Sequence, residues 1–138
     1  MKIFLDANVL VAVLNKEYPL FSYAARVLSL ANNKKFTVYT TPICLAIVFY
    51  FAEKKSGTAK AKRKINLLAE NLQIAKVDDK EVMAALSNKQ VNDFEDGLEY
   101  YAAIHNKCNI IITEDKNDFY FSTIEISNCR DFLEKYVI

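Results

Sequence analysis

The stretch VNDFEDGLEYYAAIHNKCNIIITEDKNDF, residues 91–119, decides the expected organisation of this chain. It has the pattern of an acidic turn, a helix over 93–105, a buried strand over 109–113 and a second acidic turn. Acidic residues stand at the ends of these elements: Asp93, Glu95 and Asp96 where the helix begins, and Glu114, Asp115 and Asp118 after the strand. Because ligands bind at the carboxyl ends of strands in open α/β sheets, these acids are candidates for a binding site.

Composition narrows the class of protein. A chain of 138 residues with 52% apolar residues, two glycines and two prolines is expected to form a single folded domain over 1–138, not a disordered or loop-rich chain. The net charge of +1 gives no overall attraction to nucleic acid or membrane, so any polyanion must be bound by a local patch. Three cysteines without a CxxC pair argue against a disulfide framework and favour the reducing cytoplasm. No apolar run is long enough for a membrane span, and none has the form of a signal peptide.

Hydrophobic periodicity predicts alternating strands and helices. Strands are expected at 2–5, 36–40, 109–113 and 122–126, with a strand or extended link at 73–77. Helices are expected at 9–14, 21–31, 42–55, 58–72, 78–88, 93–105 and 129–136, with Val82, Ala85 and Leu86 facing inward. This alternation predicts a three-layer α/β fold with a mainly parallel central sheet and helices on both faces.

The acids can be brought together by such a sheet. Asp6 follows the first strand, Asp93 and Asp96 begin the central helix, and Asp115 and Asp118 follow the strand at 109–113. Capping of helix N-termini would explain any one of these groups by itself. Three groups at successive element ends, in a sequence without a His/Cys site or a phosphate-binding glycine loop, favour a Mg²⁺ or Mn²⁺ site, because these ions prefer carboxylate oxygens.

The other charged features are less specific. Six basic residues lie between positions 54 and 64: Lys54, Lys55, Lys60, Lys62, Arg63 and Lys64. A solvated helix face is the simpler interpretation, and contacts to RNA phosphates are the alternative. His105 is the only histidine, so it cannot form a His cluster, and a packed or capping role is expected for it.

Three motifs resemble those of the PIN-domain ribonucleases, particularly the small toxins called VapC. They are IFLDANVL at 3–10, DFEDGLEYYAA at 93–103 and IITEDKNDF at 111–119. The resemblance implies that Asp6, Asp96 and an acid of the last motif bind Mg²⁺ or Mn²⁺, supported by Asn8 and Thr113. Both Asp115 and Asp118 are available in the last motif, and Asp118 is preferred for its place before Phe119.

The resemblance further implies a metal-dependent endoribonuclease that acts on RNA, pairs with an antitoxin protein and forms a homodimer. One position departs from the family, because Ile47 stands where a glutamate is usual. Glu53 is six residues further on and would face elsewhere on the helix. The alternatives are a non-catalytic nucleic-acid-binding or protein-interaction module, and a different acidic-pocket enzyme of the phosphatase or receiver type. A phosphatase is disfavoured because Asp6 is followed by Ala7 and Asn8 and not by a second aspartate two residues on, and a receiver because no phospho-accepting aspartate after a central strand precedes Lys116.

Overall fold

The computed structural model describes residues 1–137, and within them a single sheet holds five parallel strands in the order β3-β2-β1-β4-β5. The strands are β1 (Lys2–Leu5), β2 (Thr37–Thr40), β3 (Gln73–Ile74), β4 (Ile110–Ile112) and β5 (Glu125–Ser127). The helices are α1 (Ala7–Leu14), α2 (Leu20–Ser29), α3 (Pro42–Ser56), α4 (Thr58–Asn71), α5 (Asp79–Ser87), α6 (Phe94–His105) and α7 (Cys129–Tyr136), with short 3₁₀ turns η1 (Leu30–Asn32) and η2 (Lys116–Phe119).

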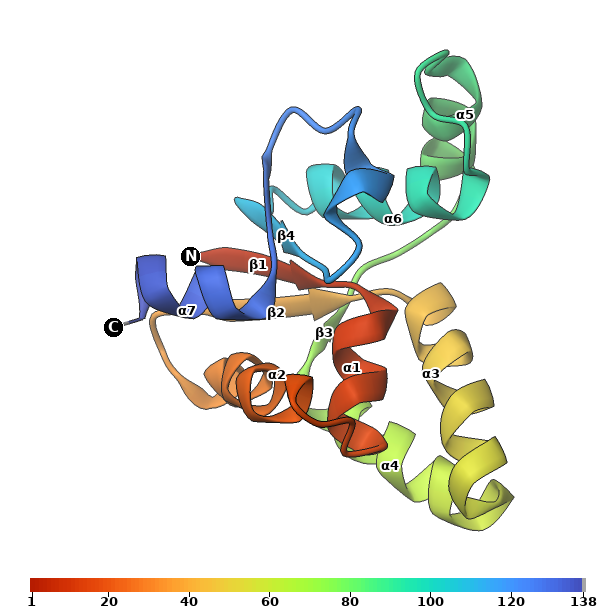
Figure 1. The fold of residues 1–138 in the computed structure, drawn as a ribbon. Helices are drawn as coiled ribbons and strands as arrows, with labels where there is room; N and C mark the ends of the chain where they lie inside the picture. The colour runs from red at the N-terminus through yellow and green to blue at the C-terminus, as the bar shows by residue number, and fades with distance from the viewer. Residues whose placement is uncertain (138) are drawn as a thin grey trace.

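The helices cover both faces of the sheet, as predicted. In Figure 1 α1, α2 and α4 lie below the strands, and α6 with α5 lies above them. β1 and β4 lie at the centre of the sheet, between the two helical layers, and every residue from Ile3 to Leu5 and from Ile110 to Ile112 is fully buried. Continuous apolar strands of this kind are typical of parallel sheets with both faces covered. Among residues 1–137, no helix has the length and apolar character needed to cross a bilayer.

The order of the strands creates a binding crevice. From β1 the chain moves to β2 and β3 on one side, and it then returns to β4 on the other side of β1. The carboxyl ends of β1 and β4 therefore border the point where the winding direction reverses, which is where open α/β sheets bind ligands. Leu5 pairs with Ile112 in the parallel register, so Asp6 and Thr113 emerge next to each other at this edge.

Two local expectations were wrong. The last strand begins at Glu125 and not at residue 122, because the Ser122 hydroxyl donates to the Ile124 carbonyl (2.7 Å) and accepts from the Ile124 amide (3.0 Å), which makes a turn. Leu86 was expected to face inward, but it is 64% exposed. The reason is that α5 packs mainly on α6, so only the Ala85 side of the helix is covered.

The close packing of α5 on α6 depends on Gly97. A Cβ at this position would lie 2.7 Å from Val91 Cγ1 and 3.0 Å from Ala85 Cβ. We expect Gly97→Ala to lower the free energy of unfolding by about 1–2 kcal/mol, because overpacking costs more than the roughly 1 kcal/mol that alanine gains in a helix. Urea denaturation measures this change.

The control for this prediction removes the closest obstacle. Val91→Ala combined with Gly97→Ala should destabilise the protein by less than the sum of the two single substitutions, because the smaller side chain makes room for the new methyl group. Strictly additive effects would show that steric conflict with Val91 is not the cause.

Candidate metal centre

Asp6 lies at the centre of the candidate site. It follows β1 and caps α1, with its Oδ1 accepting a hydrogen bond from the Ala7 amide at 2.7 Å. Its Oδ2 accepts from the hydroxyl of Thr113, the residue after β4, at 2.8 Å. Asp6 is 8% exposed and Thr113 is fully buried, so two neighbouring strand ends hold this carboxylate in one orientation.

Asn8 joins the start of α1 to the acidic turn after β4. Its side-chain amide donates to Thr113 Oγ1 and to Asp115 Oδ2, both at 3.1 Å, and its Oδ1 accepts from the Glu114 amide at 3.3 Å. The Asp115 amide in turn donates to Thr113 Oγ1 at 3.0 Å. The predicted supporting residues Asn8 and Thr113 therefore form one hydrogen-bonded network with Asp6.

The remaining predicted acids approach Asp6 from α6 and η2. Partial burial, followed by the charges of Asp93, Asp118 and Asp6, raises the pKa of Asp96 to about 7. Burial and the charges of Asp115, Asp6 and Asp93 likewise raise the pKa of Asp118 above its usual range. Burial is the largest cause of both shifts, and the charge of Asp6 contributes to each, so both carboxylates belong to the same acidic region as Asp6.

The acids of the two turns differ in their hydrogen bonds. Asp93 caps α6 by accepting from the Asp96 amide at 2.9 Å, and Asp115 accepts from Asn8. Glu114 is turned away from the site, because its Oε2 accepts from the Cys129 amide at the start of α7 (2.9 Å). Of the two candidates in the last motif, Asp118 is the one whose charge raises the pKa of Asp96.

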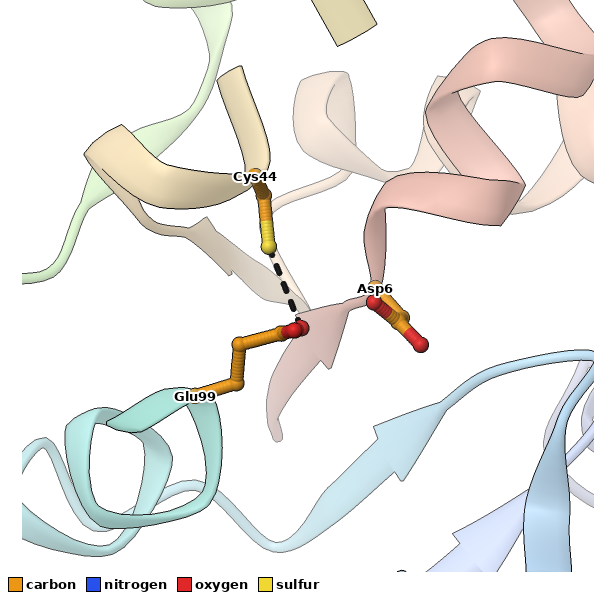
Figure 2. Close-up of side chains that lie close together, drawn as sticks. All are labelled: Asp6, Cys44 and Glu99. Atoms are coloured by element: carbon orange, nitrogen blue, oxygen red, sulfur yellow. Dashed lines mark hydrogen bonds between the residues drawn. The ribbon is translucent and has the colours of Figure 1, made fainter. Parts of the chain in front are cut away.

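A further acid, Glu99, was not among the residues predicted from sequence. It comes from α6, is 1% exposed, and accepts a hydrogen bond from the Cys44 thiol of α3 at 3.1 Å. One ligand atom from each of Asp6, Cys44 and Glu99 lies within 4.8 Å of the others, and Figure 2 shows Glu99 extending toward the space between Cys44 and Asp6. The available sequence signal was its position three residues after Asp96, which puts both acids on one face of α6.

Burial raises the pKa values of both Glu99 and Cys44. It raises the pKa of Glu99 well above the usual range, and the neighbouring charge of Asp6 raises it further. Burial, followed by the charges of Glu99 and Asp6, also raises the pKa of the Cys44 thiol, so Cys44 is a protonated donor. The site is thus most buried at Glu99 and Asp6 and opens to solvent at Asp96 and Asp118.

Within residues 1–137, no acid of the site forms an ion pair with a lysine, arginine or histidine. The ion pairs found in residues 1–137 all lie elsewhere: they join His105 to Glu81, Arg130 to Glu134 and Lys135 to Glu125. Buried carboxylates without such a partner are costly, and a divalent cation with oxygen ligands would offset their repulsion. The residues present therefore fit Mg²⁺ or Mn²⁺.

The helix α3 contributes no carboxylate to the site. Ile47 lines, with Asn8, Val11, Glu17 and Phe51, a hollow of about 280 Å³. Glu53, the only acid of α3, accepts instead from the Thr58 hydroxyl at 2.8 Å, near the far end of the helix.

Three of the six basic residues have contacts within the fold, two of them as hydrogen-bond donors. The Lys55 ammonium donates to the Asn15 carbonyl, and Lys64 donates to the Leu14 carbonyl at 3.2 Å. Both bonds place positive charge at the C-terminus of α1, where the helix dipole favours it. Lys54 lies over the Tyr50 ring, 4.7 Å from its centroid. Lys60, Lys62 and Arg63 are exposed on α4.

His105 pairs with Glu81 of α5, which agrees with a packing role.

Comparison with known proteins identifies similar chains. A family model described as PIN domain matches residues 2–117. Ribonuclease VapC1 of Aquifex aeolicus is 27% identical over 139 residues, covering 98% of this chain and 95% of that protein. Among solved structures, VapBC2 from Rickettsia felis bound to a promoter DNA fragment matches with a TM-score of 0.71 at 20% identity, covering 93% of this chain and 98% of that chain. VapC20 from Mycobacterium tuberculosis, a toxin that cleaves the sarcin-ricin loop, matches with a TM-score of 0.67 at 17% identity. The match covers 89% of this chain and 97% of that chain. The structural matches show a shared fold.

Proposed function

Because this chain belongs to the PIN domain family, we propose that it is a metal-dependent endoribonuclease that hydrolyses RNA phosphodiester bonds and acts as the toxin of a toxin–antitoxin pair. The observation that carries this proposal is the close grouping of Asp6 and Glu99 at the switch point of the sheet, with the charge of Asp6 acting also on Asp96 and Asp118 and no ion pair to any of these acids in residues 1–137. The similarity to Ribonuclease VapC1 supports the choice of RNA as substrate.

In this proposal the main task of the chain's own residues is to hold negative charge at the site where the cation binds. The Ala7 amide donates to Oδ1 of Asp6, and Thr113, with a longer contact from Asn8, donates to Oδ2, so the carboxylate is held in one orientation from which it can bind a cation. Asp96 and Asp118 form the solvent-facing side, where a phosphate group of RNA can enter. When bound, a Mg²⁺ or Mn²⁺ ion supplies an activated water for attack on the phosphate and stabilises the charge that develops there.

The proposal assigns the metal to Asp6, Asp96 and Asp118, with Asp93 and Asp115 as further acids of the same site. Asp93 and Asp115 each accept a hydrogen bond from the chain itself, so their part is to add negative charge around the cation. Asn8 and Thr113 orient Asp6. The exposed Lys60, Lys62 and Arg63 are proposed to attract RNA through its phosphates. They lie on the first turns of α4, which begins next to the end of α3 roughly 18 Å of helix rise from Cys44, so they would contact RNA outside the scissile position.

Metal removal tests the catalytic part of the proposal. Protein stripped with EDTA should leave a mixed panel of single-stranded and structured RNAs intact, and added Mn²⁺ or Mg²⁺ should restore cleavage. The measurement is gel analysis of end-labelled RNA, with Ca²⁺ added separately as a control for a general effect of divalent ions. Cleavage that persists unchanged in EDTA would contradict a metal-dependent mechanism.

A non-catalytic PIN-fold module is the second candidate, favoured because Ile47 stands where the family usually has a glutamate and Glu53 of α3 contacts Thr58 at the other end of the helix. It predicts no cleavage at any metal concentration, while RNA association persists and weakens as salt is raised. Filter binding at increasing KCl, run beside the cleavage assay, separates the two candidates.

Partners are also part of the proposal. Solved relatives of this fold include VapBC assemblies, and we propose a cognate antitoxin protein, a homodimeric state and a cytoplasmic location for this chain. Expression of the chain alone should arrest bacterial growth, and co-expression of a small protein encoded beside its gene should relieve the arrest. Unimpaired growth on expression of an RNA-cleaving chain would argue against the toxin assignment.

A further inference from the structure

Glu99 is the most deeply buried carboxylate of the site, and its side-chain partners are a thiol and a second carboxyl group, Cys44 and Asp6. It is 1% exposed, and in residues 1–137 no lysine, arginine or histidine forms an ion pair with it. The other buried glutamate, Glu81, is 4% exposed and accepts from the Asp78 amide at 2.8 Å besides pairing with His105. Packing alone does not require an acid at position 99, because a leucine or glutamine would fill the volume without the cost of a buried charge.

The position of Glu99 matches that of a metal ligand. It stands three residues after Asp96, so the two side chains leave α6 about 60° apart and face the same side. Its carboxylate extends toward Asp6 from the opposite wall of the crevice, with ligand atoms of Asp6, Cys44 and Glu99 within 4.8 Å of one another (Figure 2). Oxygen ligands about 2.1 Å from one octahedral ion lie roughly 3–4 Å apart, so only a small closure around the ion is needed.

We propose that Glu99 is a direct ligand of the divalent cation, supplied by α6 in a site to which α3 contributes no carboxylate, and that Cys44 is a positioning residue for it. The inference rests on the proposed function, whose metal it places. The Cys44 thiol donates to Oε1 of Glu99, and the ion would replace the hydrogen bond that Glu99 shares with Asp6. A hard cation prefers this carboxylate oxygen to the thiol sulfur.

Direct measurement of metal affinity tests the proposal without RNA. Mn²⁺ is titrated calorimetrically into wild-type protein and into Glu99→Gln, which keeps the side-chain volume and removes the charge. We expect the variant to bind Mn²⁺ at least about tenfold more weakly, since loss of an outer-shell partner alone costs about 10–100-fold. Glu81→Gln is the matched control, because it removes the other buried glutamate and should leave Mn²⁺ affinity within about twofold of wild type.

The outcomes separate this inference from the proposed function. Unchanged affinity in Glu99→Gln, together with lost affinity in Asp6→Asn, would overturn the role of Glu99 and leave the proposed site standing. Absence of Mn²⁺ binding by the wild-type protein would overturn both. If Glu99→Gln does not fold, anomalous diffraction from Mn²⁺ in wild-type crystals decides: a Glu99 oxygen in the inner coordination sphere supports the proposal, and a manganese ion bound without it contradicts the proposal.

Discussion

Replacing Asp6 with asparagine is expected to lower the rate of RNA cleavage by about a thousandfold or more. The substitution keeps the shape of the side chain and an oxygen that can accept from Thr113 or Ala7, but it removes the negative charge at the centre of the site. Mutation of a residue that contacts a metal ligand lowers metal affinity or activity by about 10–100-fold, and loss of the charge of a ligand itself should lower activity further. Initial rates on end-labelled RNA at saturating Mn²⁺ measure the effect.

The same assay distinguishes the acids of the last motif. Asp118→Asn should lower the cleavage rate almost as much as Asp6→Asn, because the Asp118 charge acts on Asp96. Asp115→Asn should lower the rate less, because Asp115 accepts a hydrogen bond from Asn8. Asp131→Asn, an exposed substitution in the first turn of α7, is the charge control and should retain wild-type rates. Equal rates for wild type and Asp6→Asn would remove the proposed active site.

The second large effect concerns stability without metal. The pKa of Asp96 is raised from 3.8 to about 7 in the folded protein. The folded state therefore favours the protonated acid, and its stabilising contribution is complete below pH 3.8 and is lost as the pH rises through about 7. We expect the ionisation of Asp96 to lower the melting temperature in EDTA by about 5 °C between pH 5 and pH 8. This figure is reduced for solvent screening, because Asp96 is partly exposed. Circular dichroism at 222 nm follows the transition.

A bound cation should reverse this dependence. Mg²⁺ stabilises the ionised carboxylates, so it should raise the melting temperature more at pH 8 than at pH 5, where protons compete for the same oxygens. Asp96→Asn should flatten the pH profile in EDTA, and Asp131→Asn should reproduce the wild-type profile. A metal-free protein that becomes more stable between pH 5 and pH 8 would contradict the assignment of a raised pKa to Asp96.

The sequence determined the class of fold and the edge of the sheet at which the candidate acids lie. The apolar runs at 2–5 and 109–113 and the helical periodicity at 93–105 depend on which residues are buried, and this pattern is visible along the chain. Because parallel strands end at a common edge, the positions of Asp6 and Thr113 after their strands were enough to bring them together. The end of a strand and the start of a helix are local properties, so the places of Asp6 after β1 and of Asp96 in the first turn of α6 could be predicted.

Only the tertiary structure decided which side chains meet across the crevice. Glu99 and Cys44 are 55 positions apart, and their contact depends on how α3 packs beside α6, which no local pattern encodes. The same holds for Lys55 and Lys64, whose contacts with α1 follow from the turn between α3 and α4. The physical reason is that periodicity reports whether a residue is buried, whereas the partner of a buried polar group is set by the angles between packed helices.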